Sequence, residues 1–121
     1  MPLLYKKRKF DIRHYIVVTC INGCRKGYWF TDGYVRTTSF EYKPGAGCEA
    51  VHLTNDAVQK NFPDYGKYEK GNKLSYDQID AYIQKLHPGK SFYRDIYPNM
   101  KVVHFLWRPW GLTSSRPAPA T

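Results

Sequence analysis

Acidic residues, cysteines and long apolar runs are scarce in this sequence of 121 residues. Only 10 Asp and Glu residues stand against 19 Lys and Arg, so the formal net charge is +9. We therefore expect attraction to polyanions, a class that includes acidic protein tails, nucleotide phosphates, nucleic acids and acidic membranes. No apolar run approaches the roughly 20 residues of a membrane span, and residues 1–4 are too short for a signal peptide. We expect a cytoplasmic protein.

The cysteines are Cys20, Cys24 and Cys48, an odd and sparse set that argues against a disulfide framework and fits a reducing compartment. Together with His52 they form a C-x3-C and C-x3-H pattern that loosely resembles a zinc site. The first pair lies at the end of a predicted strand. We therefore interpret the three residues as unpaired thiols and predict no metal site.

The composition is typical of a folded chain, with 42% hydrophobic and 17% aromatic residues. Its length allows one ordinary domain and excludes a second full one. Residues 10–20 are predicted to form a strand, because they are rich in Ile, Val and Tyr and alternate in their first half. This alternation puts Lys9, Asp11 and Arg13 on one face. The opposite face, predicted to pack, carries Phe10, Ile12, Ile16 and Val18.

A hairpin is predicted around Asp32-Gly33, because Asp-Gly between the strand-like runs 28–30 and 34–39 is a good turn signal. Antiparallel strands follow from it. Arg36 lies in the second arm and would face the same cleft as Arg13 if the arms pair beside the first strand. The sequence leaves the register open.

The chain after about residue 43 is predicted to be helical between loops. Residues 43–47 and 62–72 hold Pro and Gly and are expected to be loops, and residues 56–60 a short helix capped by Thr54 or Asn55. Ser75 and Gln78 have the spacing of a capping box, so a helix is expected from Ser75. Its apolar positions are Ile79, Tyr82, Ile83 and Leu86. A last helix should begin near Pro98, with Met100 and Val103 on one face.

Two groups of residues are candidates for binding phosphate or ribose. The charged strand face suits a bound anion chain, and the run His52-Leu53-Thr54-Asn55 offers a ring, a hydroxyl, an amide and backbone N–H groups before a helix. Each group taken alone also fits a simpler reading, as a solvated strand edge or as a helix cap.

The combination of motifs closely resembles the tubulin–tyrosine ligase family in order and spacing, from about Arg8 to about Val103. The matching motifs are Lys9-Phe10-Asp11-Ile12-Arg13, Gly33-Tyr34-Val35-Arg36-Thr37-Thr38-Ser39, His52-Leu53-Thr54-Asn55 with Gln59-Lys60, Gly71-Asn72-Lys73-Leu74-Ser75, Asp95-Ile96-Tyr97-Pro98 and Met100-Lys101.

This resemblance implies an α+β fragment of an ATP-grasp fold, an antiparallel sheet followed by helices. Family members are ATP-dependent ligases that activate a carboxylate as an acyl phosphate and join a free amino acid, such as Tyr, Glu or Gly, to tubulin tails. Carried over by motif, the positions that line the ATP site are Lys9, Asp11, His52, Leu53, Thr54 and Asn55. Arg13 and Arg36 would be the catalytic cations that face the phosphates and the acidic acceptor, where guanidinium groups stabilise negative charge.

The resemblance also divides the chain into a basic flank (1–8), a partial ligase domain (9–105) and a divergent tail expected to be disordered (106–121). Family members hold magnesium with carboxylates that follow the last helix, whereas this sequence has no acidic residue after Asp95 and departs from the pattern near His104. Phosphoryl transfer depends on that metal. We therefore expect a ligase fragment that is inactive alone, located in the cytoplasm on microtubules, in a cilium or flagellum among other places.

Two alternatives stay open. A non-catalytic module could use the net charge of +9 to bind acidic tubulin tails or microtubules. A nucleic-acid binder could use the basic run Lys6–Lys9 with exposed aromatic residues. The latter is disfavoured, because aromatic residues at strand spacing are more typical of a core. The basic run also resembles a nuclear import signal, but it adjoins the first strand and is interpreted as its flank.

Overall fold

The computed structural model describes residues 2–106, the last three of them by their backbone only. The predicted tail lies outside these residues except for Leu106. The elements in chain order are β1 (Arg8–Ile21), β2 (Cys24–Glu41), α1 (Glu49–His52), α2 (Asp56–Gln59), the 3₁₀ turn η1 (Lys70–Asn72), β3 (Lys73–Ser75), α3 (Tyr76–Leu86), the π turn η2 (Phe92–Ile96) and α4 (Tyr97–Leu106). None of the helices within this range is long and apolar enough to cross a membrane.

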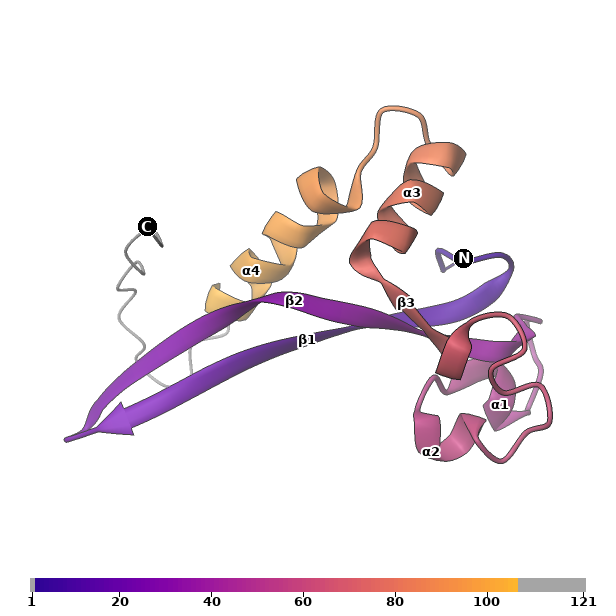
Figure 1. Ribbon diagram of the computed structural model, residues 1–121, viewed down its shortest axis with the longest axis horizontal. Coiled ribbons are helices and arrows are strands. Elements are labelled where there is room, and N and C mark those ends of the chain that lie inside the picture. The colour runs from indigo at the N-terminus through magenta and orange to yellow at the C-terminus, as the bar shows by residue number, and fades with distance from the viewer. Residues whose placement is uncertain (1, 107–121) are drawn as a thin grey trace.

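The three strands form one antiparallel sheet in the order β1-β2-β3. Figure 1 shows β1 and β2 as a long twisted ribbon, with α3 and α4 on one side of it and α1 and α2 near the end where β2 finishes. β3 pairs only with Tyr34, Val35 and Arg36 of β2. The α+β arrangement, a sheet followed by helices, is confirmed.

The hairpin turn lies at Asn22-Gly23, so its predicted place at Asp32-Gly33 is wrong. Ile21 pairs with Cys24, and Asn22 and Gly23 both have positive φ values, 50° and 76°. Positive φ at both central residues is what a two-residue turn of the favoured type needs, and Asn-Gly supplies it at low cost. β2 runs without interruption through Asp32-Gly33.

Gly33 serves a different purpose, the close approach of two chain segments. A Cβ atom there would lie 2.2 Å from the Tyr76 hydroxyl oxygen and 2.4 Å from the Arg13 carbonyl oxygen. The Tyr76 hydroxyl donates a hydrogen bond of 3.0 Å to that carbonyl. The pairing register shifts here, between His14 and Ile16, because three residues of β2 lie opposite one of β1.

One face of the sheet packs against the helices. Ile12, Val35 and Leu74 are neighbours across the three strands, and Val35 is fully buried. α3 covers them with Ile79 and Ile83, which are 1% and 5% exposed. The capping box is confirmed, since the Ser75 side chain accepts from the Gln78 N–H and the Gln78 side chain accepts from the Ser75 N–H. The predicted helix from Ser75 is thus present as α3, and the predicted last helix near Pro98 is present as α4.

The outer half of the ribbon extends beyond this core. Phe10 and Ile12 pack as predicted, but Ile16 and Val18 are 39% and 54% exposed, so their predicted burial is wrong. The predicted apolar positions Leu86 and Val103 are also exposed. The helices are too short to cover a ribbon of this length.

Candidate functional site

The face of the sheet opposite the core carries a row of charged side chains. Asp11 of β1 pairs with Arg36 of β2, which pairs with Lys73 of β3. Residues directly opposite each other in a sheet point to the same face. The row is therefore fixed by the register that also directs Ile12, Val35 and Leu74 into the core. We call this row and the side chains bonded to it the charged face.

Asp11 is the centre of the charged face. Arg36 donates from Nε to one Asp11 oxygen at 2.9 Å and from Nη2 to the other, and Thr54 Oγ1 donates to the second oxygen at 2.7 Å. Partial burial raises the pKa of Asp11, but these hydrogen bonds and the positive charge of Arg36 outweigh it and lower the pKa below its ordinary value. The hydrogen bond to Asp11 in turn raises the pKa of Arg36. Asp11 is thus held as a carboxylate.

Lys9 and His52 form a second contact beside it. Lys9 Nζ lies 2.8 Å from His52 Nδ1, and His52 Nε2 lies 2.5 Å from the Ala46 carbonyl oxygen. Because a carbonyl only accepts, His52 carries its proton on Nε2 and accepts from Lys9 at Nδ1. Lys9 Nζ also lies 4.9 Å from the centre of the Tyr42 ring. The ammonium group is therefore positioned at the end of the charged face.

Lys73 and Asp56 belong to the charged face, and neither was predicted as a site residue. Lys73 Nζ lies 2.8 Å from Asp56 Oδ2, and this hydrogen bond raises the pKa of Lys73. Asp56 is the first residue of α2, and Lys73 is the first residue of β3. The Gly-Asn-Lys-Leu-Ser motif contains Lys73, so it was a signal for this cation, but it did not reveal the partner.

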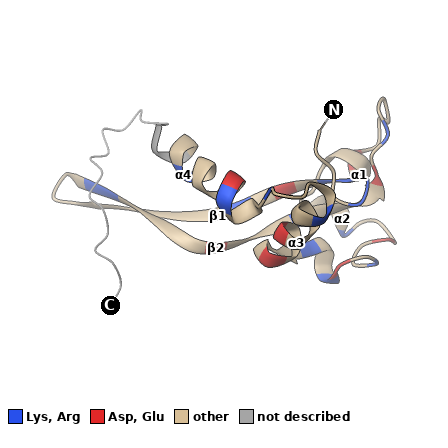
Figure 2. Ribbon diagram, turned by 90° about the horizontal axis from the view of Figure 1, so that it is seen from above, with Lys and Arg blue, Asp and Glu red and all other residues tan. Residues whose placement is uncertain are grey.

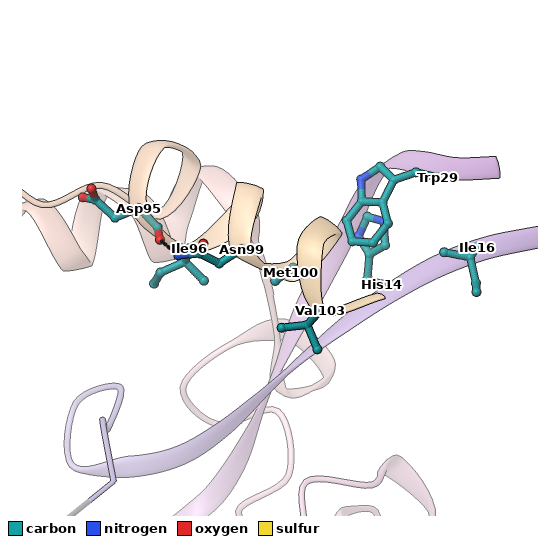
Figure 3. Close-up of a pocket in the computed structure, with 8 residues that line it drawn as sticks. All are labelled: His14, Ile16, Trp29, Asp95, Ile96, Asn99, Met100 and Val103. Atoms are coloured by element: carbon teal, nitrogen blue, oxygen red, sulfur yellow. Dashed lines mark hydrogen bonds between the residues drawn. The ribbon is translucent and has the colours of Figure 1, made fainter. Parts of the chain in front are cut away.

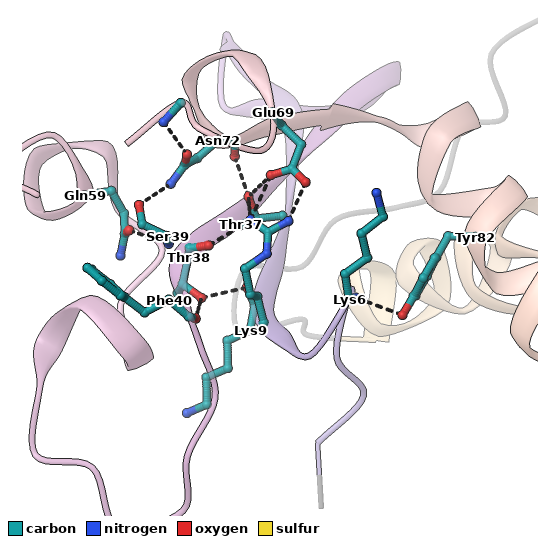
Figure 4. Close-up of polar contacts among 12 residues, drawn as sticks. Lys6, Lys9, Thr37, Thr38, Ser39, Phe40, Gln59, Glu69, Asn72 and Tyr82 are labelled. Carbon is teal, nitrogen blue, oxygen red and sulfur yellow. Dashed lines mark hydrogen bonds and ion pairs between the residues drawn. The ribbon is translucent and has the colours of Figure 1, made fainter. Parts of the chain in front are cut away.

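The segment that carries His52 and Thr54 is attached to β2 by one buried side chain. Gln59 is fully buried, and its Oε1 accepts from the Ser39 N–H at 2.8 Å (Figure 4). Its Nε2 donates to the carbonyl oxygens of Ala50 and Leu53. α1, which was not predicted, is therefore held against the sheet. This attachment fixes where the His52 ring and the Thr54 hydroxyl lie.

A buried ion pair supports the same end of the sheet. Arg8, 2% exposed, contacts the Glu69 carboxylate with both terminal nitrogens, at 2.9 Å from Nη1, and donates to the Thr38 carbonyl at 3.0 Å. Thr37 Oγ1 also donates to Glu69, at 3.0 Å (Figure 4). The basic N-terminal segment therefore enters the core with Arg8, and the loop before β3 is tied to β1.

The structure brings together five of the eight predicted site residues, namely Lys9, Asp11, Arg36, His52 and Thr54. Arg13 is exposed on the same face, one pair further along the ribbon, opposite Tyr34. Leu53 is 43% exposed, and Asn55 occupies the N-cap of α2 without a side-chain hydrogen bond. Leu53 and Asn55 therefore flank the charged face, and the structure shows no side-chain hydrogen bond from either of them to it.

A pocket of about 490 Å³ lies on the other face, between the ribbon and α4 (Figure 3). The His14 and Trp29 rings stack 3.6 Å apart at its wall, and Met100 and Val103 of α4 line the opposite side. Trp29 Nε1 donates to the Tyr97 hydroxyl at 2.9 Å. No residue predicted for the site lines this pocket.

Metal ligands are not assembled in the part of the chain that the structure describes. No group of three or more His, Cys, Asp or Glu side chains comes together within residues 2–106. Both oxygens of Asp11 are already engaged by Arg36 and Thr54. The donors present therefore do not fit magnesium, and the three cysteines are free and exposed.

Comparisons with known proteins agree with the motifs. The model of the tubulin-tyrosine ligase family matches residues 1–104. Tubulin glycylase 3B of Drosophila melanogaster is 35% identical over 69% of this chain and 12% of its own length. Protein polyglycylase TTLL10 of Macaca fascicularis is 34% identical over 68% of this chain and 13% of its own. Probable tubulin polyglutamylase TTLL9 of Rattus norvegicus is 34% identical over 74% of this chain and 19% of its own length.

The chain thus spans between an eighth and a fifth of the length of these relatives, 12% to 19%. The matched region contains both strands of the ribbon, the charged face and most of α4. The family match and the structure concern the same residues. The chain belongs to the tubulin-tyrosine ligase family.

Proposed function

We propose that the chain forms part of the ATP-grasp domain of a ligase that adds an amino acid to tubulin tails. Membership of the family supports this, as do relatives whose names describe a tubulin glycylase and a tubulin polyglutamylase. The observation that carries the proposal is the charged face, where four cations, Lys9, Arg13, Arg36 and Lys73, lie together with only two carboxylates, those of Asp11 and Asp56. Cations held this way attract phosphates and acidic acceptors.

Each predicted residue has a role in this proposal. ATP would supply the phosphoryl group that activates a carboxylate. Lys9 and His52 would hold phosphate and base at one end of the face, with Thr54, Leu53 and Asn55 beside them. Asp11 orients the Arg36 guanidinium by two hydrogen bonds, so that this cation needs no rearrangement to meet negative charge. Arg13 is exposed and would meet the acidic acceptor.

We propose that the chain alone turns over negligibly. Phosphoryl transfer needs a divalent cation held by carboxylates, and residues 2–106 bring no suitable group of donors together. The complete enzyme would then draw these donors from elsewhere. Residues 9–105 would be its partial ATP-grasp domain, acting on tubulin at the cytoskeleton, including cilia and flagella, with a free amino acid as the second substrate.

Thermal unfolding with and without magnesium-ATP tests this proposal. A ligand that binds only the folded state at about 100 times its dissociation constant adds about 2.7 kcal/mol of stability. We expect ATP to raise the melting temperature of the parent chain, and Lys9→Ala to abolish this effect. Lys85→Ala, which removes an exposed lysine of α3, is the matched control and should respond like the parent.

A cooperative transition that ATP does not move would contradict the nucleotide site. It would favour the second function supported by the net charge of +9, non-catalytic binding to acidic tubulin tails. Co-sedimentation with microtubules, without ATP and over a range of salt concentrations, measures that activity directly. Attachment that weakens as salt rises is the expected result for such a module.

A further inference from the structure

The outer half of the ribbon continues the charged face as a row of aromatic side chains. Residues paired across the two strands share this face: Arg13 with Tyr34, Val17 with Tyr28, and Thr19 with Lys26. Tyr15 lies between the first two pairs, with its ring 6.3 Å from that of Tyr34. We call Arg13, Tyr15, Val17, Lys26, Tyr28 and Tyr34 the tyrosine face.

Most of the tyrosine face is open to solvent. Tyr15 and Tyr28 are each 48% exposed and Val17 is 56% exposed, while α3 and α4 lie on the other side of the ribbon (Figure 1). A two-stranded ribbon with apolar groups exposed in this way gains little stability by itself. Exposed aromatic groups of this number indicate a binding surface.

Positive charge alone is present on this half of the ribbon. Residues 12–31 contain Arg13, Arg25 and Lys26 but no Asp or Glu. Arg25 and Lys26 follow the turn that joins the two strands, and Figure 2 shows a blue, basic stretch near that end of the ribbon. The pairing of Thr19 with Lys26 and of Cys20 with Arg25 puts these two neighbours on opposite faces. Lys26 therefore belongs to the tyrosine face, whereas Arg25 does not.

Tyr34 joins this surface to the charged face. Lys73 Nζ lies 5.6 Å from the centre of the Tyr34 ring, and the Tyr34 ring contacts Tyr15. Arg13 and Thr19, which is opposite Lys26, are six residues apart on β1, a separation of about 20 Å at about 3.3 Å per residue. An extended peptide of similar length covers this distance.

We propose that the tyrosine face binds an extended acidic peptide, which lies along the ribbon between Arg13 and Lys26 and delivers its end to the charged face. Carboxylates would pair with the two cations, and the tyrosine rings would contact the intervening chain. Single-stranded nucleic acid is also bound by cations combined with exposed aromatic rings. Relatives whose names describe a tubulin glycylase and a tubulin polyglutamylase favour the peptide, and the test below separates the two. The identity of the peptide as an acceptor tail rests on the proposed function.

Fluorescence anisotropy with a fluorescein-labelled poly-glutamate peptide and the full chain tests this proposal at low salt. We expect Lys26→Glu to weaken binding by at least about fivefold, since it reverses a charge on the tyrosine face. Arg25→Glu is the matched control, because it changes the net charge equally on the opposite face, and should change affinity by less than about twofold. Tyr28→Ser should weaken binding more than Val18→Ser, because Tyr28 lies on the tyrosine face and Val18 lies on the opposite face. An unfolding curve for each variant establishes that the ribbon is intact.

Equal losses in Lys26→Glu and Arg25→Glu, or no loss in either, would overturn the proposal. A single-stranded oligonucleotide that binds the parent more tightly than the peptide, with the same sensitivity to Lys26→Glu, would overturn it in favour of nucleic acid. The ATP-dependent melting temperature reports the proposed nucleotide site separately. Peptide binding that depends on Lys26 without an ATP effect supports this surface and contradicts the nucleotide site; the reverse result contradicts this surface alone.

Discussion

The backbone at Gly33 lies so close to Tyr76 that an added Cβ atom would stand 2.2 Å from the Tyr76 hydroxyl oxygen and 2.8 Å from the ring carbon that bears it. Neither atom can move away freely, because the hydroxyl is bonded to the Arg13 carbonyl and Tyr76 is 2% exposed. We therefore expect Gly33→Ala to lower the free energy of unfolding by about 1–3 kcal/mol.

Urea unfolding measures this loss. Gly47→Ala is the matched control, since nothing lies within 4 Å of a Cβ atom at that position. A Gly33→Ala chain as stable as Gly47→Ala would show that Tyr76 does not lie against β2.

Removal of the Glu69 carboxylate should be the most damaging change to the polar interior. Arg8 and Glu69 have side chains 2% and 7% exposed, so Glu69→Ala leaves a buried guanidinium without its counter-charge. Loss of one partner of such a pair costs about 3–5 kcal/mol. Asp64→Ala removes a pair with Lys67 whose side chains are 31% and 55% exposed, and it should cost less than about 1 kcal/mol. Chemical denaturation compares the two, and equal costs would contradict the burial of Arg8.

Two of the helix N-caps, Ser75 and Asn55, should respond differently to alanine. Ser75 accepts a hydrogen bond from the Gln78 N–H, whereas Asn55 makes no side-chain cap bond to α2. Ser75→Ala should therefore cost about 1 kcal/mol and Asn55→Ala considerably less. Thermal unfolding followed by circular dichroism measures both. A larger effect of Asn55→Ala would mean that its side chain has a structural role that the capping geometry does not show.

Acid should destabilise the chain partly through Asp11. The pKa of Asp11 in the folded state lies below its ordinary value of 3.8. At pH values between the folded pKa and the ordinary pKa, the unfolded state therefore binds more protons than the folded state. The contribution of Asp11 to stability is thus complete above the ordinary pKa and is lost as the pH falls through the folded pKa. Asp11→Asn should remove this part of the acid dependence, and Thr54→Val, which removes one donor, should reduce it.

The free energy of unfolding, determined by urea at several pH values on the acid side, provides the measurement. Parallel pH profiles for the parent and Asp11→Asn would contradict the ion pair with Arg36. At neutral pH Asp11→Asn still lowers stability, because the pair is broken there too.

Local signals in the sequence predicted α3 and α4 well, but they missed α1 and misplaced the hairpin turn. Ser75, Gln78 and the apolar spacing after them suffice to form α3, because a capping box and an amphipathic face depend only on neighbouring residues. Asp32-Gly33 and Asn22-Gly23 look alike as turn signals. In the fold, Gly33 lies within β2 against Tyr76, a residue 43 positions further along the chain. A local sequence pattern cannot reveal such a contact.

The candidate site shows the same division. Lys9, Asp11 and Arg13 share a face by strand alternation alone. His52 and Thr54 were candidates from their side-chain chemistry before a helix, and Arg36 from its place in the predicted hairpin; the motif resemblance brought these groups into one site. Asp56 and the pair of Arg8 with Glu69 could not be predicted, because each depends on how the loops fold back over the sheet. Charged residues in a basic chain are ordinarily expected on the surface.

The irregularity between Trp29 and Gly33 constrains how this segment can change in length. Ile16 pairs with Trp29 and His14 with Gly33, so the three residues between them on β2 face one residue of β1. An insertion or deletion of two residues would leave the alternation of β2 intact. A change of one residue would exchange Lys26 and Tyr28 with Arg25 and Trp29 between the two sides of the ribbon. We therefore expect related sequences to differ in the length of this segment of β2 by even numbers of residues.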